Sequence, residues 1–106
     1  MDKRHTLSYD GDVKPFRWNR AKNELLRAQR GVDFEVVAVA IESGGLLDVL
    51  AHPHPERYPG QRIAVVDVGG YAMLVPYAEA EDHLFLKTVI PSHKATRAYL
   101  GGRNDA

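Results

Sequence analysis

The chain has no cysteine, which excludes several kinds of site from the outset. A disulfide framework, a thiolate metal centre and a cysteine nucleophile all need residues that the sequence lacks. Long apolar runs are missing as well, so neither a signal peptide nor a membrane span of about 20 residues is predicted. We therefore expect a soluble cytoplasmic protein, although a lack of cysteine does not itself identify a redox compartment.

Net charge is also lacking, but the charges are unevenly placed along the chain. Residues 1–31 contain 8 Lys or Arg against 4 Asp or Glu, residues 32–86 contain 2 against 9, and residues 87–106 contain 4 against 1. If the two positive ends meet in the fold, they form one basic surface that attracts nucleic acid despite the neutral total. We expect them to meet, with Lys22 and Arg97 on the same side of the molecule.

A chain of 106 residues with 44% hydrophobic content is large enough for one compact domain with a modest core. The stretch before Pro15 is polar and shows no hydrophobic period, as is typical of a loosely attached extension. We predict a flexible extension at residues 1–14, a single domain at residues 15–100 and a flexible tail at residues 101–106.

A short strand and a helix are predicted next. Phe16 and Trp18 stand at alternate positions, which is the period of a strand, and Asn19 is a good N-cap. A helix over residues 20–30 follows, and Gly31 ends it. The residues expected to face the core are Ala21, Leu25, Leu26 and Ala28.

A second helix is predicted from Phe34 to about Ser43, with Asp33 as its N-cap and Gly44 and Gly45 after its end. Its apolar residues at helical spacing are Phe34, Val37, Ala38 and Ile41. Because this helix is apolar on more than one side, we expect it to pack between the first helix and the sheet.

Four strand-like runs follow, at residues 46–51, 62–68, 71–77 and 83–90. Gly69-Gly70 predicts a tight hairpin, and residues 78–82 predict a looser, acidic one. Residues 52–60 hold three prolines and are expected to form an exposed loop. This order predicts an α+β fold in which two N-terminal helices pack on a four-stranded antiparallel meander, followed by a short C-terminal helix.

The last of these runs has an unusual composition. The stretch from Leu84 to Ile90 is almost wholly apolar, which predicts a central strand buried on both faces. Lys87 interrupts it. This lysine must therefore lie near a strand end, extend to the surface, or occupy a site where an anion offsets its desolvation.

Cations gather at the start of the predicted C-terminal helix. Ser92 is a suitable N-cap, and His93, Lys94 and Arg97 follow it closely. Backbone N–H groups at a helix start also favour anions, so the arrangement fits a phosphate-bearing partner. The alternative is a solvated basic helix that binds nothing.

Metal-free cleavage of RNA would give these residues a role. The ribose 2′-hydroxyl attacks the adjacent phosphorus while one group takes its proton, another protonates the leaving 5′-oxygen, and cations stabilise the phosphorane. His93 could transfer protons near neutral pH, and Lys87, Lys94 and Arg97 could hold the phosphate. The alternative for His93 is an exposed histidine at a helix start with no catalytic role.

Three further features have competing interpretations. His52 and His54 lie in a proline-rich loop without a third ligand at a recognisable spacing, so we predict no metal site and no cofactor. Trp18 either anchors the core or stacks on a base, and most tryptophans of small domains pack. Glu24 and Glu35 are the carboxylates nearest a possible basic face, or simply charges on helix surfaces.

Several motifs, taken together, resemble a known family. They are Phe16-x-Trp-Asn-x-x-Lys-Asn23, Gly31-Val-x-Phe-Glu35 and Phe85-Leu-Lys-Thr-Val-Ile-Pro-Ser-x-Lys-Ala-Thr-x-x-Tyr99. In order and spacing they resemble the BrnT-type toxins, small members of the RelE-like ribonuclease group. The resemblance covers about residues 15–100.

The resemblance implies a RelE-like fold and the toxin half of a type II toxin–antitoxin pair, which is a metal-independent endoribonuclease that cleaves RNA. It also implies an antitoxin, usually of the ribbon-helix-helix type, that covers the active surface. The expected assembly is a homo-oligomer or a heterotetramer. No membrane partner is implied. The alternative is a catalytically inactive binding module that acts with the antitoxin as a partner or co-repressor.

The resemblance also implies site residues. In that group activity depends on basic residues of the final strand and following helix, here Lys87, Lys94 and Arg97. We add His93 to this catalytic set; relatives commonly carry arginine at its position, so either phosphate stabilisation is weakened or proton transfer is gained. The residues expected to contact RNA are Trp18, Arg20, Lys22 (the basic first-helix position of the group) and Tyr99.

Overall fold

The computed structural model describes residues 8–9 and 12–104. The strands are β1 (Ser8–Tyr9), β2 (Asp12–Val13), β3 (Phe16–Arg17), β4 (Leu46–Ala51), β5 (Gln61–Val68), β6 (Tyr71–Glu79), β7 (Leu84–Leu86) and β8 (Ile90–Pro91). The helices are α1 (Arg20–Arg30), α2 (Phe34–Ala40), the π-helical turn η2 (Ile41–Gly45) and α3 (His93–Asn104). No helix in this part of the chain is both long and apolar enough to cross a bilayer.

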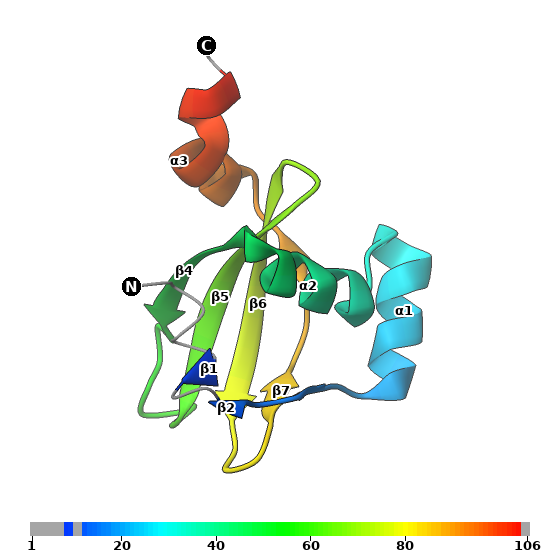
Figure 1. Cartoon of the computed structure of the whole chain (residues 1–106), viewed down its shortest axis with the longest axis vertical. Helices are drawn as coiled ribbons and strands as arrows, with labels where there is room; N and C mark the ends of the chain where they lie inside the picture. The colour runs from blue at the N-terminus through cyan, green and yellow to red at the C-terminus, as the bar shows by residue number, and fades with distance from the viewer. Residues whose placement is uncertain (1–7, 10–11, 105–106) are drawn as a thin grey trace.

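One mixed sheet forms the centre of the fold (Figure 1). Its strands lie in the order β3-β7-β6-β5-β4, and β8 pairs with β6 beyond the end of β7. All neighbours are antiparallel except β3, which runs parallel to β7. The predicted α+β class is confirmed. The predicted count of four strands is corrected to six, because β3 joins the edge and the last predicted strand is divided.

The division of the predicted strand at residues 83–90 has a visible cause. β7 ends at Leu86, and pairing with β6 resumes only at Ile90. In the gap, the carbonyl of Val89 accepts a hydrogen bond of 2.6 Å from Arg30 Nη1, and the Val89 side chain is fully buried. Ile90 is 39% exposed, so the prediction of a strand buried on both faces is wrong. The segment has one buried and one open face, as is common in antiparallel sheets.

Helix α2 covers the face of the sheet that is at the front in Figure 1. Its residues Phe34, Val37 and Ile41 are buried in the main core, as predicted. The Trp18 ring stacks on Phe34 with 5.6 Å between the ring centroids. Trp18 therefore packs against the core while staying only half-buried, which is the more common alternative for a tryptophan of a small domain; its contact with RNA stays a prediction.

Helix α1 begins and ends where the sequence predicts. The Asn19 side chain accepts a hydrogen bond from Lys22 N at 2.9 Å, and Gly31 has the left-handed φ of 68° of a C-terminal cap. Its buried face is different, because Asn23 and Leu26 are buried while Leu25 is 49% exposed. The other predicted core residues of this helix, Ala21 and Ala28, are exposed. The predicted core side of α1 is wrong because one of its two buried residues, Asn23, is polar and was not counted among the core residues.

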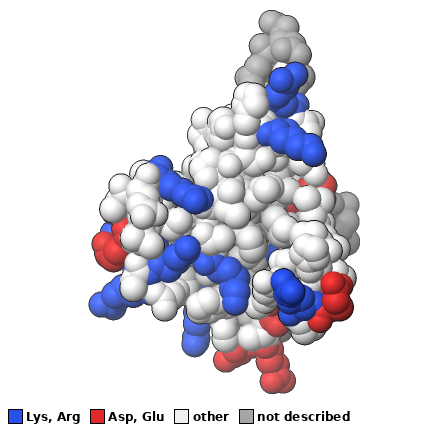
Figure 2. Space-filling model, turned by 180° about the vertical axis from the view of Figure 1, so that it is seen from behind, with Lys and Arg blue, Asp and Glu red and all other residues white. Residues whose placement is uncertain are grey.

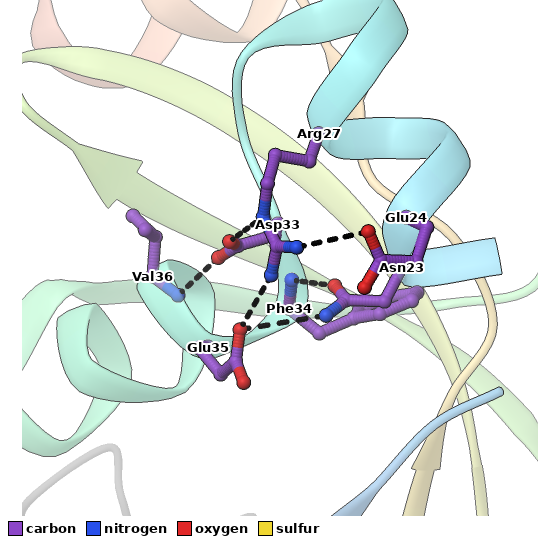
Figure 3. Close-up of polar contacts among 7 residues, drawn as sticks. All are labelled: Asn23, Glu24, Arg27, Asp33, Phe34, Glu35 and Val36. Atoms are coloured by element: carbon purple, nitrogen blue, oxygen red, sulfur yellow. Dashed lines mark hydrogen bonds and ion pairs between the residues drawn. The ribbon is translucent and has the colours of Figure 1, made fainter. Parts of the chain in front are cut away.

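Figure 3 shows why a polar residue occupies that position. Asn23 Oδ1 accepts from the buried N–H of Phe34 at 2.7 Å, and its amide nitrogen lies 3.4 Å from Glu35 Oε1. Arg27 contacts three carboxylates: Asp33 at 2.9 Å, and Glu24 and Glu35 at 3.1 Å each. The Asp33 side chain also caps α2 by accepting from Val36 N, which is the main reason that the pKa of Asp33 is lowered.

These contacts fix the corner between α1 and α2. Glu24 and Glu35 are thus helix-surface charges paired with Arg27, which is the structural alternative that the sequence left open. The same corner contains Asn23, Phe34 and Glu35 of the motifs behind the family resemblance. At least these motif residues therefore stabilise the fold.

The turns between the helical and strand segments also follow the sequence. Gly69 and Gly70 form the predicted two-residue hairpin with φ of 62° and 91°, which other residues rarely adopt. Asp67 Oδ1 accepts from Gly70 N at 2.8 Å inside that turn. The proline-rich loop at residues 52–60 is largely exposed, as expected.

The two ends of the chain differ from the predicted extension and tail where they are described. β1 and β2 form a separate two-stranded antiparallel sheet, and Lys14 Nζ pairs with Glu79 Oε2 at 2.7 Å. At the other end α3 continues to Asn104, beyond the predicted domain boundary. Residues 1–7, 10–11 and 105–106 of the predicted flexible segments lie outside the described residues.

Helix α3 packs on the face of the sheet opposite α2. Ser92 Oγ accepts from Ala95 N at 3.0 Å, which confirms the predicted N-cap. Ala95 and Leu100 of the helix form a second small core with Val65 and Ala72 of the sheet. The helix thus covers one end of this face.

Thr96 fastens α3 to the sheet, and its loss should be measurable. Its hydroxyl accepts from the buried N–H of Ala72 at 2.8 Å and donates to Ser92 O at 2.7 Å. Thr96→Val keeps the shape but leaves that N–H unsatisfied, so the free energy of unfolding should fall by about 1–3 kcal/mol. Thr96→Ser, which keeps the hydroxyl, should lose less in the same urea titration. Equal losses for the two variants would contradict this role of the hydroxyl.

Candidate functional site

The face of the sheet opposite α2, here called the open face, is only partly covered. Helix α3 occupies its end near the Gly69-Gly70 hairpin. Toward the other end, the strand register places four residues side by side in one row: Arg17, Phe85, Ala78 and Gln61. Arg17 is exposed and the other three are half-buried. This row is therefore accessible from solvent.

Lys87 lies beside that row. It directly follows the last residue of β7, and its N–H donates to Pro76 O at 2.8 Å. Its Nζ lies 5.9 Å from the centroid of the Phe85 ring, within the range of a cation–π contact. Of the three explanations for a lysine in this apolar run, a position at a strand end with an exposed side chain is the one found.

The three remaining predicted catalytic residues lie on α3. His93, Lys94 and Arg97 are all exposed. Ala95, Thr96 and Leu100 face the sheet, so helical spacing places the three predicted residues on the opposite, outer side of the helix. They form one exposed surface, separate from the row that contains Phe85.

Tyr99, which was expected to contact RNA, makes a contact within the protein. Its hydroxyl donates to Asp48 Oδ2 at 2.7 Å and ties α3 to β4. This hydrogen bond to a carboxylate is the main cause of the raised pKa of Tyr99. The ring remains 38% exposed, so one side of Tyr99 is still accessible.

Figure 2 shows the distribution of charge on the side of the molecule opposite α2. Lys and Arg side chains gather on the left half and centre of this view and again on α3 at the top, while Asp and Glu lie mainly at the lower edge and sides. The face thus carries much positive charge although the chain is neutral overall. Such a face attracts polyanions.

The expected meeting of the two basic ends of the chain is found only in part. Figure 1 shows α1 beyond the β3 and β7 edge of the sheet and α3 at its upper end, so the cations of α1 (Arg20 and Lys22) and those of α3 form separate groups. The reason is that α3 packs on β6, whereas α1 is held at the corner with α2. The two ends of the chain do touch through Arg30 and the Val89 carbonyl.

The cations of these groups are not neutralised by carboxylates of the described segments. Ion pairs between residues of 8–9 and 12–104 involve Lys14, Arg27 and His83. None of those pairs includes Arg17, Arg20, Lys22, Lys87, Lys94 or Arg97. Within those residues the charge of Arg17 still acts on Asp82, where it contributes to the lowered pKa of that carboxyl group.

The two loop histidines contact each other and Tyr58. His54 N donates to His52 Nδ1 at 3.0 Å, and the His52 ring lies 4.6 Å from the Tyr58 ring. Among the described residues there is no group of three or more His, Asp or Glu that could hold a metal ion.

Sequence reasoning missed two residues of the open face, Arg17 and Phe85. They become neighbours only through the parallel pairing of β3 with β7, whose residues lie far apart in the chain. The available signal was the alternation within Leu84, Phe85 and Leu86, where two buried leucines flank a half-buried ring. The prediction that this run is buried on both faces left no exposed side for Phe85.

Comparison with known proteins adds no further constraint. No protein-family model, no curated protein and no solved structure matches the chain. Proposals about its activity therefore depend on its own residues and on the resemblance of its motifs.

Proposed function

We propose that the chain is a metal-independent endoribonuclease with a RelE-like fold, the toxin of a type II toxin–antitoxin pair. The observation that carries this proposal is the gathering of Lys and Arg side chains on the side that holds α3 and the open face (Figure 2). His93, the group suited to proton transfer near neutral pH, lies among them on α3. The BrnT-like order of motifs supports the same assignment.

The chemistry needs only side chains. A 2′-hydroxyl oxygen attacks phosphorus, its proton goes to a base, and the 5′-oxygen leaves with a proton from an acid, giving a 2′,3′-cyclic phosphate and a 5′-hydroxyl. His93 serves proton transfer, and Lys94 and Arg97, one helical turn or less away, stabilise the phosphorane. All three are exposed, which allows a long substrate to approach without a pocket.

Lys87 has a different position in this scheme. The Lys87 N–H donates a hydrogen bond to the Pro76 carbonyl of β6. The Ser92 N–H, just before α3, donates to the Ala72 carbonyl of the same strand. Four residues along a strand correspond to about 13 Å. Lys87 is therefore assigned to a different nucleotide of the bound RNA from the one at His93.

The proposed partner is an antitoxin of the ribbon-helix-helix type that covers the cationic side. An acidic or extended antitoxin segment would bind there by charge complementarity and compete with RNA. The proposed setting is the cytoplasm, where both partners and RNA are present. A small reading frame next to this one with a strand, two helices and a polar tail would support the pairing.

Cleavage of RNA in the presence of EDTA tests the proposal. Purified protein should convert an end-labelled single-stranded RNA to fragments ending in a 2′,3′-cyclic phosphate, since no step requires a metal. Arg57→Ala, which removes an exposed cation of the 52–60 loop, is the matched control and should cleave normally. Cleavage that stops with EDTA and returns with Mg²⁺ would contradict the mechanism.

One observation favours the second candidate, a binding module without catalysis. His93, Lys94 and Arg97 are exposed to water on the outer side of α3, whereas a dry site usually strengthens such electrostatic catalysis. In that case the same assay should show a tight RNA or antitoxin complex and no fragments.

A further inference from the structure

One aromatic residue on the open face, Phe85, has two basic residues as neighbours. Arg17 and Phe85 are register partners on adjacent parallel strands, which are about 4.8 Å apart. Lys87 Nζ lies 5.9 Å from the centre of the same ring. Phe85 therefore has Arg17 as its neighbour on β3 and the ammonium of Lys87 over its ring.

The Phe85 ring is accessible because of strand alternation. Leu84 and Leu86 turn to the front core and are 0% and 2% exposed, while Phe85 points to the open face and is half-buried. Its cross-strand neighbour on β6 is Ala78, a small residue that cannot cover the ring. A flat ligand can thus reach it.

The surroundings of the ring favour an anion. Its neighbours in the sheet, Ala78, Gln61, Pro76 and Ile63, are uncharged. The acidic group nearest to this row by its interactions is Asp82, whose pKa is lowered mainly by its hydrogen bond with His83 and to a lesser extent by the charge of Arg17. Asp82 is thus already engaged at 2.8 Å with His83.

We propose that Arg17, Phe85 and Lys87 form a subsite for one unpaired base of RNA, with the base stacked on Phe85 and the flanking phosphates held by the two cations. The subsite rests on the proposed function and specifies its substrate as single-stranded RNA. Every base has a π-face, so stacking tolerates sequence, and cations that follow the backbone supply the remaining affinity. In a duplex both faces of a base are already stacked, which excludes it from this subsite.

The subsite also changes the role of Lys87. The side chain is exposed at a strand end, so it can move from the ring to a phosphate when a base arrives. Lys87 is then a binding residue, and proton transfer remains with the α3 group.

Binding of a fluorescent single-stranded RNA in EDTA, measured by anisotropy, tests this subsite. Phe85→Leu keeps apolar volume but removes the π-face, and we expect Kd to rise about 5- to 100-fold. Phe85→Trp should bind at least as tightly as the wild type. Tyr71→Ala is the matched control, since Tyr71 is 37% exposed on the same sheet but points to the side of Met73 and Val75, away from Phe85.

The salt dependence separates stacking from charge. Arg17→Gln and Lys87→Gln should each lower the slope of log Kd against log salt by about 0.7, whereas Phe85→Leu should leave the slope unchanged. Wild-type affinity in Phe85→Leu, or equal affinity of the wild type for a duplex of the same sequence, would overturn the subsite while leaving an RNA-binding function intact. If the wild type binds no RNA, the subsite and the proposed function both fail.

Discussion

Asn23→Ala should lower the free energy of unfolding by about 2–3 kcal/mol, a large share of the stability of a domain of this size. The Asn23 side chain is 5% exposed and accepts from the Phe34 N–H at 2.7 Å. Alanine removes that acceptor and leaves a buried donor unsatisfied, which costs about 1–3 kcal/mol, and the lost volume adds a cavity term. Urea denaturation should show a lower midpoint without a change in the slope.

Two further variants make this result interpretable. Gln29→Ala, an exposed position on the same helix, should stay within about 0.5 kcal/mol of the wild type. Asn23→Asp keeps the acceptor for Phe34 but places a carboxylate near Glu35, so at neutral pH it should be destabilised and should recover part of the loss in acid. A change for Asn23→Ala no larger than that for Gln29→Ala would show that the corner in Figure 3 is not important for stability.

Local signals in the sequence were enough to predict most elements of the fold. Asn19, Asp33 and Ser92 each cap the helix assigned to them, because a side-chain oxygen needs only the N–H groups of its own first turn. The Gly69-Gly70 hairpin follows for the same reason, since its positive φ values are a property of the residues themselves. These features depend on neighbours in the chain.

The features that the sequence did not predict depend on residues that are far apart in the chain. Arg30 donates a hydrogen bond to the carbonyl of Val89, at the point where the sequence pattern predicts one continuous strand and the structure has a break. Asn23 is buried because Phe34, across the α1–α2 corner, supplies its partner, and this moves the core side of α1 away from Leu25. Hydrophobic periodicity contains no information about either partner.

The candidate site likewise contains residues that the sequence predicts and residues that only the tertiary structure brings together. Lys94 and Arg97 could be named from helical spacing after a cap, and they do share one exposed surface. Arg17 and Phe85 could not, since only the parallel pairing of β3 with β7 makes them neighbours. The charge pattern alone could not show that α1 and α3 pack on different parts of the sheet, because nothing in it fixes the direction in which α3 leaves the sheet.

Lys94→Ala/Arg97→Ala should lower the rate constant of RNA cleavage by about 10²- to 10³-fold, since loss of a single donor to a developing oxyanion already costs that much in well-studied enzymes. Both side chains are exposed on the outer side of α3, and alanine favours a helix, so the double variant should unfold at the same urea concentration as the wild type. A loss of activity then reports on the site and not on folding. Single-turnover cleavage at saturating protein separates the chemical step from binding.

The charge-conserving variants make that test specific. Arg97→Lys and Lys94→Arg keep the charge but change the geometry of the donors, so each should retain more activity than the corresponding alanine variant. The subsite at Phe85 should still bind RNA in the Lys94→Ala/Arg97→Ala variant, because Phe85 pairs with Ala78, which lies about 20 Å along β6 from Ala72 at the start of α3. A double variant that binds RNA as tightly as the wild type but cleaves it with a strongly reduced rate constant would identify α3 as the catalytic element. A double variant that cleaves at the wild-type rate would remove α3 from the mechanism, whatever the open face binds.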